Sequence, residues 1–271
     1  MPIHDDAGPL LQQLVDAVRS ARKYAAVSQQ LIARIGAAEL DKGRRLKDAI
    51  KATKGKLHQI AAAYQATDID YAQWSEEVAG HAQDDQALRM FCLHAMQQHA
   101  STRERIPILT EFYEQIFLRT GEVATVLDLA CGLNPLALPW MPFAPHTQYL
   151  ACDIYQDQVG FLNHFLSTIG VPGHVWVCDL LSTPSLPKTD LILLLKALPC
   201  LEQIDKSAVA SLLTSLDAPH IVLSFPVQSI GGRGKVLLAT YRDRFSELRR
   251  LLKWEFEELL FDTELAYFGI R

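Results

Sequence analysis

The stretch VLDLACGLNPLAL, residues 126–138, decides the fold. Its apolar run, typical of a buried strand, reaches an acid at Asp128. A turn of small residues follows, Ala130, Cys131 and Gly132, before a second apolar stretch. A pyrophosphate site would require several glycines, so that backbone N–H groups can crowd the phosphates. One glycine makes a less open turn, which suits a ligand with a ribose and an adenine but no phosphates.

From residue 123 onward, short runs rich in Val, Ile and Leu alternate with helical patterns. We predict strands at 125–130, 148–153, 174–179, 190–195 and 220–225, and helices near 135–140, 156–169, 202–216 and 236–252. The first four runs are almost continuously apolar, as in strands buried on both faces of a parallel sheet. Two last runs, 254–261 and 264–271, predict an antiparallel hairpin. This pattern indicates an α/β fold of the Rossmann-like class I methyltransferase type, since a dehydrogenase sheet is all parallel.

The first part of the chain has a different texture. Apolar residues recur at helical spacing over 8–99, and a further helix is expected over 99–121, ending at Gly121. We therefore expect two domains, an N-terminal helical segment at 1–99 and a Rossmann-like domain at 100–271.

Charge is distributed unevenly along the chain, whose net charge is −5. Residues 1–66 hold 11 Lys and Arg against 6 Asp and Glu (+5), whereas residues 67–271 hold 15 against 25 (−10). The basic residues concentrate in 19–24 and 41–56. They form either a solvated helix face or a phosphate-facing surface on an otherwise acidic protein.

Several classes are disfavoured by composition. The sequence contains no apolar run of 18 residues and does not begin like a signal peptide. Its five cysteines are scattered, without a C-x-x-C pair. We expect a cytoplasmic, reduced protein without a membrane span, disulfides or a metal site.

Acids follow three of the predicted strands: Asp128, Asp153 and Asp179. Ligands of open α/β sheets bind at the carboxyl ends of the strands, so these side chains are candidates for one site. Asp153 lies roughly twenty residues beyond the turn, where a carboxylate can accept both ribose hydroxyls. Asp179 is placed to reach an adenine edge. S-adenosylmethionine is a ligand of this kind, and Cys131 is interpreted as a small apolar filler rather than a nucleophile.

Five segments together resemble one family: HASTRER (99–105), VLDLACGLNPLAL (126–138), ACDIYQ (151–156), LKALPCLEQ (195–203) and LSFPVQSIGGRGK (223–235). The family is the aminoglycoside-resistance 16S rRNA methyltransferases that modify N7 of a guanine in the decoding A site. The resemblance covers most of the chain and implies a monomer that uses S-adenosylmethionine. It also implies 16S rRNA in the 30S subunit as the partner, docked through basic residues in 19–56.

The resemblance also implies roles for matching residues. Arg105 would pair with the methionine carboxylate of the cofactor, and Ala130 and Gly132 would flank the methionine portion. Asp153 would hold the ribose, Asp179 the adenine amino group, and Leu180 the adenine face. The substrate side would hold Lys196, Glu202 and Arg233, the last in a glycine-rich loop expected to order on RNA. Without the resemblance, Arg105 is equally well an exposed helix residue that pairs with Glu104 or Glu111.

Guanine N7 carries a lone pair and no proton, so it can attack a sulfonium methyl group in line without a general base. The enzyme must then mainly position the two reactants. The target base is expected to turn out of its helix, and to stack on an aromatic or Arg side chain that the sequence does not identify. The sequence is consistent with attack by N7 rather than by an exocyclic amine. KALPCLE follows the fourth strand in place of the [D/N]-P-P-[Y/F] motif that polarises an exocyclic amine.

Three other interpretations stay open at this point. Pro199-Cys200 occupies about the place where RNA cytosine-C5 methyltransferases carry their nucleophilic thiol. A non-catalytic protein that binds the small subunit would keep the sheet and the basic N-terminus. A small-molecule methyltransferase would not need the N-terminal segment.

Overall fold

A single seven-stranded sheet forms the centre of the molecule, in the order β3-β2-β1-β4-β5-β7-β6. The structure is a computed structural model that describes residues 7–62, 69–182, 184–227 and 234–271. Strands β1 to β5 run parallel, and β7 pairs antiparallel with both β5 and β6. The Rossmann-like fold and its closing hairpin are thereby confirmed. The strands span Thr125–Leu129, Gln148–Asp153, Gly173–Val177, Leu191–Leu195, His220–Pro226, Glu255–Leu260 and Glu264–Ile270, for β1 to β7 in turn.

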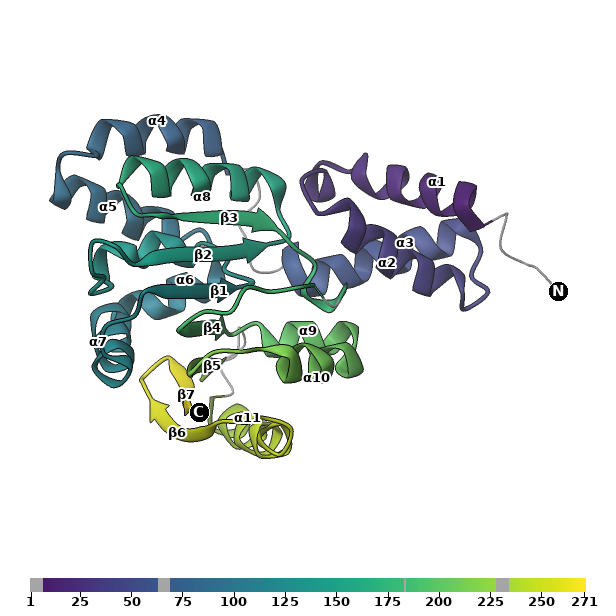
Figure 1. Ribbon diagram of the computed structural model, residues 1–271. Helices are drawn as coiled ribbons and strands as arrows, with labels where there is room; N and C mark the ends of the chain where they lie inside the picture. The colour runs from purple at the N-terminus through teal and green to yellow at the C-terminus, as the bar shows by residue number, and fades with distance from the viewer. Residues whose placement is uncertain (1–6, 63–68, 183, 228–233) are drawn as a thin grey trace.

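Helices cover both faces of the sheet (Figure 1). Side chains alternate along each strand, so Val126 and Leu191 belong to one core while Leu127 and Ile192 belong to the other. The first core is closed by α4 (Tyr71–His81), α5 (Asp85–Met96), α7 (Leu109–Thr120) and α8 (Gln156–Thr168). The second is closed mainly by α10 (Lys206–Ser215) and α11 (Gly234–Arg249). The result is a three-layer arrangement with a sheet buried on both faces.

Local sequence signals set where several helices begin and end. Asp70, Asp84 and Asp205 each accept backbone N–H bonds as N-caps of α4, α5 and α10. The cap at Asp205 divides the helix predicted over 202–216 into α9 (Leu198–Ile204) and α10. The stretch predicted as a helix at 135–140 is instead a 3-10 helix over Asn134–Trp140, with a proline in its first turn.

The helix predicted over 99–121 is interrupted. It forms α6 (Ala100–Arg105), a 3-10 turn at Ile106–Ile108, and α7. Pro107 lies in that turn, where its missing N–H disfavours a continuous helix. The helix ends at Gly121 as expected, with a positive φ of 66°.

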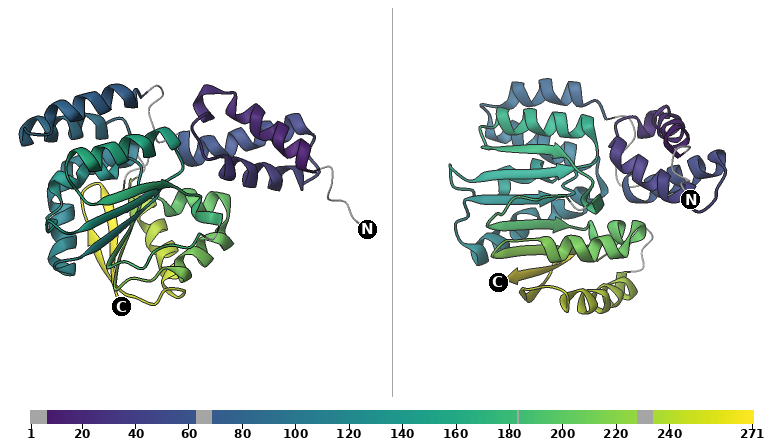
Figure 2. Two further views of the ribbon diagram at one scale, coloured as in Figure 1. Left: turned by 45° about the horizontal axis from the view of Figure 1, so that its top comes forward. Right: turned by 45° about the vertical axis from the view of Figure 1, so that its right-hand side comes forward.

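The N-terminal helical unit comprises α1 (Ala7–Arg19), α2 (Gln29–Leu40), α3 (Leu46–Leu57) and the short helical turns Arg22–Tyr24 and His58–Ala62. It has its own core, which includes Leu14, Ile32 and Leu57. The unit stands beyond the carboxyl ends of β1 to β3 (Figures 1 and 2).

The packing differs from the expected domain boundary at residue 99. Helices α4 and α5 contribute Trp74, Leu88 and Phe91 to the core that also holds Val126 of the sheet. The separate unit therefore covers residues 7–62, and α4 and α5 belong to the body of the molecule. A helical pattern in sequence shows that a helix has a buried face, but does not show what that face packs against.

A short joint fastens the N-terminal helical unit to the sheet. Val27 forms an isolated antiparallel bridge with Tyr155, and the N–H of Ser28 donates to the carbonyl of Ile154 (2.7 Å). Residues 154 and 155 directly follow Asp153 at the end of β2. The unit is thus attached at the edge of the sheet where ligands of this fold bind.

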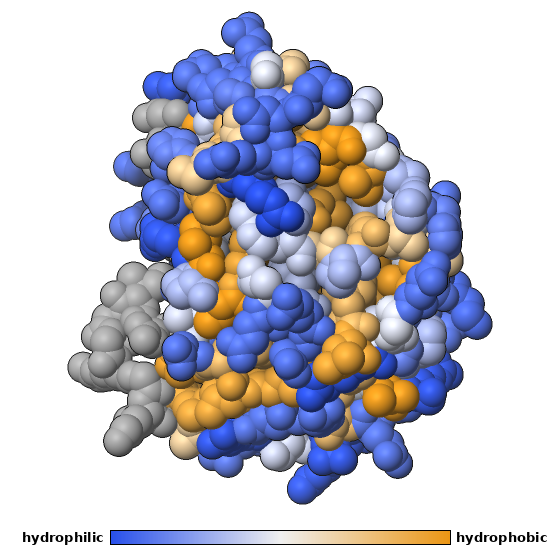
Figure 3. All heavy atoms as spheres, turned by 90° about the vertical axis from the view of Figure 1, so that its left-hand side faces the viewer, coloured by the Kyte–Doolittle hydropathy of each residue, from blue (hydrophilic) through white to orange (hydrophobic). Residues whose placement is uncertain are grey.

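The side of the molecule built from α4, α5 and α7 faces the viewer in Figure 3, with apolar side chains gathered in its middle and lower part. Met90 on α5 and Leu118 on α7 are exposed, by 61% and 77%. The basic segments lie in the N-terminal helical unit, at the other end of the molecule (Figure 1). Over the described residues, no helix is both long and apolar enough to span a membrane.

Candidate active site

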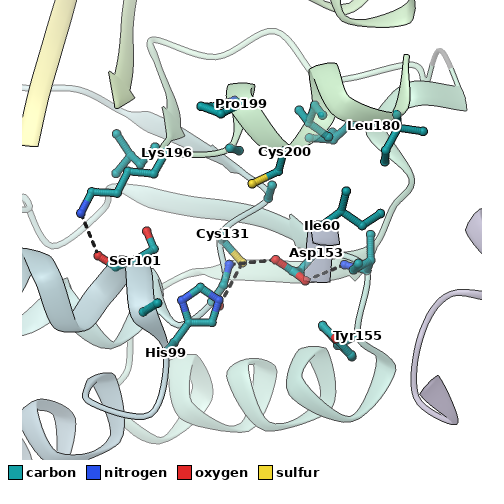
Figure 4. A pocket seen from close by; sticks show the side chains of 18 of the residues that line it. Ile60, His99, Ser101, Cys131, Asp153, Tyr155, Leu180, Lys196, Pro199 and Cys200 are labelled. Atoms are coloured by element: carbon teal, nitrogen blue, oxygen red, sulfur yellow. Dashed lines mark hydrogen bonds between the residues drawn. The ribbon is translucent and has the colours of Figure 1, made fainter. Parts of the chain in front are cut away.

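A cavity of about 300 Å³ lies at the carboxyl ends of the parallel strands. The segments that follow β1, β2, β3 and β4 line it, and they include Ala130, Asp153, Asp179 and Lys196. These residues were predicted from four separate segments of the sequence, and the fold brings them together around one cavity. Figure 4 shows Asp153, Leu180 and Lys196 there. The volume lies at the lower end of the range for small-molecule sites.

The turn after β1 has two residues in the left-handed region, Ala130 (φ 51°) and Gly132 (φ 53°). A Cβ atom at Gly132 would lie 2.9 Å from the His99 ring, so a side chain there would be both strained and in collision. Ala130 adopts this conformation at a cost of about 1–2 kcal/mol. Such backbone strain is typical of ligand sites, where the surrounding structure maintains it.

Asp153 ends β2 with both carboxylate oxygens held by the backbone. Oδ2 accepts from the N–H of Gly132 (2.8 Å), and Oδ1 accepts from its neighbour Ile154 (2.7 Å). Burial raises the pKa of Asp153, although these backbone bonds oppose the rise. The carboxylate keeps acceptor capacity beyond these backbone bonds, which a vicinal diol can use.

Asp179 lies between β3 and the turn Leu180–Ser182. Its carboxylate binds Arg34, a residue that the sequence did not indicate. Arg34, on α2 of the N-terminal helical unit, donates to both of its oxygens, from Nε (2.6 Å) and from Nη2 (3.0 Å). Leu180 lines the cavity beside it. The two residues are 145 positions apart, so local sequence gave no signal for this contact.

Arg105 is buried, with an exposure of 1%, so the alternative of an exposed helix residue is wrong. Its Nε and Nη2 donate to the carboxylate of Glu264 (2.9 and 2.7 Å), and its Nη1 donates to Asn134 (2.8 Å). Burial lowers the pKa of Arg105, but the Glu264 carboxylate outweighs this effect and raises it. Arg105 lies behind the cavity wall rather than in it. Its expected contact with the methionine carboxylate stays a prediction.

Lys196 follows β4 in the left-handed region (φ 57°), a conformation rare for a side-chain-bearing residue. Its Nζ donates to the carbonyl of Ser101 (3.2 Å) and to Glu104 (3.0 Å), and it forms an ion pair with Glu264 (3.2 Å). Glu264 therefore connects Lys196 with Arg105. It lies in the middle of the predicted hairpin, where the sequence gives no sign of such a role.

Asp128 does not line the cavity, whereas the other two strand-end acids, Asp153 and Asp179, do. Its Oδ2 accepts from Asn134 (2.8 Å) and from the Tyr149 hydroxyl. Burial raises its pKa to about 6, while these bonds oppose the rise. Asp128 thus stabilises the turn after β1 through its hydrogen bond with Asn134.

Glu202 lies on α9 and is held by Arg244 of α11, which donates from Nε to both carboxylate oxygens (2.9 and 3.1 Å). The pair ties α9 to the helix that follows the glycine-rich loop. Arg233, predicted on the substrate side, lies outside the described residues.

His99 also lines the cavity and was not singled out from sequence. Its ring packs against Gly132, and its Nδ1 is buried without a hydrogen-bond partner among the described residues. Burial lowers the pKa of His99 to about 4, helped by the charges of Arg105 and Lys196. The imidazole is therefore neutral at neutral pH.

The cavity has two chemically different ends. At one end, Asp153 and Asp179 can accept hydrogen bonds beside the apolar Leu180 and the Leu31 and Ile60 side chains of the N-terminal helical unit. At the other, Lys196 lies near Pro199 and Cys200 (Figure 4). The first end thus combines hydrogen-bond acceptors with apolar walls, the combination that an adenosine requires.

This sheet topology, with acids after β2 and β3, defines the class of S-adenosylmethionine-dependent methyltransferases. A family model described as "Ribosomal RNA methyltransferase (FmrO)" matches residues 19–268. The chain belongs to this family, and the resemblance noted in the sequence is confirmed.

Two relatives that the chain matches over nearly their whole length are both named "16S rRNA (guanine(1405)-N(7))-methyltransferase". The chain is 37% identical over 261 residues to that of Micromonospora echinospora, covering 95% of each protein. It is also 37% identical over 266 residues to that of Frankia casuarinae, covering 94% of this chain and 93% of the relative. Among solved structures, 16S rRNA methyltransferase RmtF in complex with S-adenosyl-L-homocysteine is similar at a TM-score of 0.83 and 33% identity, with 96% and 98% of the two chains covered. Methylase RmtB is similar at 0.77 and 27%, with the same shares covered.

Proposed function

We propose that this protein transfers the methyl group of S-adenosylmethionine to N7 of a guanine in the decoding A site of 16S rRNA. The observation that carries the proposal is the two-ended cavity at the carboxyl ends of the strands. It occurs in a chain that matches a relative with this name over 95% of that relative's length. The consequence would be resistance to aminoglycosides, which act at that site.

The residues present fit the cofactor. Asp153 offers two held oxygens to a ribose diol, and Asp179 and Leu180 offer an acceptor and an apolar face to adenine. Ala130 and Gly132, in the left-handed turn that lines the cavity, would flank the methionine portion. When bound, S-adenosylmethionine supplies an electrophilic methyl group on a sulfonium.

The protein's task is then to hold the guanine in line with that group. N7 needs no proton removed, and positioning alone can supply several kcal/mol of the barrier. We assign this task to Lys196, Glu202 and Arg233. Lys196 is fixed by Ser101, Glu104 and Glu264, so its ammonium occupies one place at the cavity.

Docking on the 30S subunit is assigned to the basic residues in 19–56. Glu39, itself 1% exposed, gathers three of them by ion pairs: Lys42 (2.7 Å), Arg44 (2.8 Å) and Lys56 (2.9 Å). One buried carboxylate thus holds three cations on the surface of the N-terminal helical unit. Affinity for the subunit should fall steeply as salt rises. We further propose that the protein acts as a monomer in the cytoplasm.

The test is transfer of tritium from labelled S-adenosylmethionine to purified 30S subunits, with the product mapped by borohydride reduction and aniline cleavage. Cleavage at a decoding-site guanine establishes the base and the atom together. Label without cleavage would indicate another atom or base and would overturn the N7 assignment. Absence of label would overturn rRNA as the substrate.

The relatives, which are named guanine N7 methyltransferases, do not favour cytosine-C5 methylation, although Cys200 lines the cavity and its Sγ points toward the middle of it (Figure 4). A covalent adduct with RNA containing 5-fluorocytosine would support it.

Deletion of residues 1–66 cannot test the hypothesis of a small-molecule substrate, because Leu31 and Ile60 form part of the cavity wall and their loss would change the cavity itself. Charge reversal at the exposed Lys47 and Lys51 is the cleaner test. It should lower transfer to subunits without lowering cofactor affinity. Unchanged transfer would overturn docking through these two lysines. Cofactor binding without any transfer to subunits, in the wild type as well, would favour a small-molecule substrate or a non-catalytic protein.

A further inference from the structure

The carboxylate proposed for adenine, Asp179, is held by the N-terminal helical unit. Arg34 donates to Oδ2 from Nε and to Oδ1 from Nη2, at 2.6 and 3.0 Å. The Asp179 side chain is 3% exposed and that of Arg34 is 28% exposed. A two-bond contact between a planar guanidinium and a carboxylate fixes the carboxylate plane, as one lysine contact would not.

The remaining acceptor capacity of Asp179 can be counted. Each carboxylate oxygen accepts about two hydrogen bonds. Oδ1 accepts from Arg34 and from the N–H of Leu181 (3.1 Å), whereas Oδ2 accepts from Arg34 alone among the described donors. One acceptor position on Oδ2 is therefore left for a single N–H donor. The exocyclic amino group of adenine is such a donor.

Helix α2 presents Arg34 at this place because of its periodicity. Leu31 and Arg34 are three residues apart and share one helix face. Leu31 lines the cavity, and the preceding segment is fastened to residues 154 and 155 beside Asp153. The N-terminal helical unit thus contacts the segments that follow both β2 and β3, which carry the two cofactor acids.

We propose that Arg34 is a positioning residue for adenine recognition, which orients Asp179 so that its remaining acceptor position meets the adenine amino group. The inference rests on the cofactor role proposed for Asp179. Because Arg34 belongs to the N-terminal helical unit, cofactor affinity depends on how that unit is docked. By reciprocity, bound cofactor favours the docked position of the unit that is to meet rRNA.

The experiment compares S-adenosylhomocysteine with its analogue in which hydrogen replaces the adenine amino group, both measured by calorimetry on the full chain. We expect the wild type to prefer S-adenosylhomocysteine by about tenfold, the worth of one hydrogen bond to a charged acceptor. Arg34→Gln should lower the affinity for S-adenosylhomocysteine by about tenfold and that for the analogue by less than about twofold. Arg34→Lys, which keeps the charge but loses the second bond, should lie between.

Arg119→Gln is the matched control. Arg119 forms a similar two-bond pair with Glu257 (2.8 and 2.7 Å), with a 21% exposed side chain, far from the cavity on α7. It should leave both affinities unchanged. In an Asp179→Ala background, Arg34→Gln should cause no further loss of affinity for S-adenosylhomocysteine, because the carboxylate that Arg34 orients is absent.

Loss of affinity for both ligands by the same factor in Arg34→Gln would overturn the inference, since Arg34 would then only support the cavity wall. Additive losses in the double variant, or no loss in Arg34→Gln, would overturn it as well. An Asp179→Ala variant that keeps the full preference for S-adenosylhomocysteine would instead overturn the adenine role of Asp179 in the proposed function.

Discussion

Arg105 donates two hydrogen bonds to Glu264, a residue 159 positions away, at 2.9 and 2.7 Å. Both side chains are fully buried, at 1% and 0% exposure, and Glu264 also forms an ion pair with Lys196. Burial raises the pKa of Glu264, but the charges of Arg105 and Lys196 outweigh this and lower it. One acid on the closing hairpin thereby pairs with two cations, Lys196 in the cavity wall and Arg105 behind it.

Replacing Glu264 by glutamine should lower the free energy of unfolding by about 3–5 kcal/mol, because it leaves the buried Arg105 charge uncompensated. Urea denaturation measures this loss. The control is Glu257→Gln, whose partner Arg119 and own 54% exposed side chain make a surface pair worth about 0–1 kcal/mol. Equal effects in the two variants would contradict a buried ionic network around Glu264.

Asp153→Ala should weaken S-adenosylhomocysteine binding by at least about tenfold, because the ribose would lose a charged acceptor. Calorimetry gives the affinity, and circular dichroism shows whether the fold is kept. Asp217→Ala serves as the control, since Asp217 is 54% exposed and pairs with Arg271 outside the cavity. Unchanged affinity in Asp153→Ala would remove the ribose assignment.

Arg244→Gln should lower methyl transfer to 30S subunits by about tenfold while leaving cofactor affinity unchanged, because Glu202 would lose the partner that holds it. Arg242→Gln is a control on the same helix, since Arg242 binds Glu258 on β6 instead. A similar fall in both variants would mean that α11, rather than Glu202, accounts for the effect.

Stability should depend on pH through His99. Its pKa is about 4 in the folded protein against an ordinary 6.5, so between these values the unfolded chain binds the proton more readily. The stability contribution of the neutral His99 ring is fully present above pH 6.5 and is lost as pH falls toward 4, by about 3 kcal/mol in all.

Asp128 has the opposite effect on stability over part of this pH range. Burial raises its pKa to about 6, so the folded protein binds this proton more readily than the unfolded chain and gains stability as pH falls. Urea unfolding as a function of pH should therefore be compared between wild type and His99→Asn, which keeps Asp128. The variant should lose less stability on acidification. Identical pH profiles would show that the His99 ring is accessible to protons in the folded state.

Cys200→Ala should retain full methyl transfer, because an attack by guanine N7 needs no protein nucleophile. The measurement is the same tritium assay on 30S subunits. Loss of transfer, together with failure of the variant to form an adduct with 5-fluorocytosine RNA, would support cytosine-C5 chemistry instead.

The sequence by itself determined the strands, the closing hairpin, the acids after β2 and β3, and the family. These follow from local properties: apolar runs mark buried strands, a single glycine at 132 marks a turn without phosphates, and motif residues lie close together in the chain. It also placed Arg105 and Lys196 in the site region, although the first is buried behind the cavity wall.

Only the tertiary structure decided which groups these residues meet. Arg34 reaches Asp179 and Glu264 reaches Arg105 across more than half of the chain, and the pairings depend on how the N-terminal helical unit and the hairpin pack on the sheet. Asp128 shares the face of Val126 because side chains alternate along β1, so it points into the core below the turn. Helical periodicity likewise showed that α4 and α5 have buried faces, but only packing showed that α8 and the 3-10 helix Asn134–Trp140 bury them. Periodicity is a property of neighbours in the chain, whereas a salt bridge between distant residues is a property of the folded surfaces that bring them together.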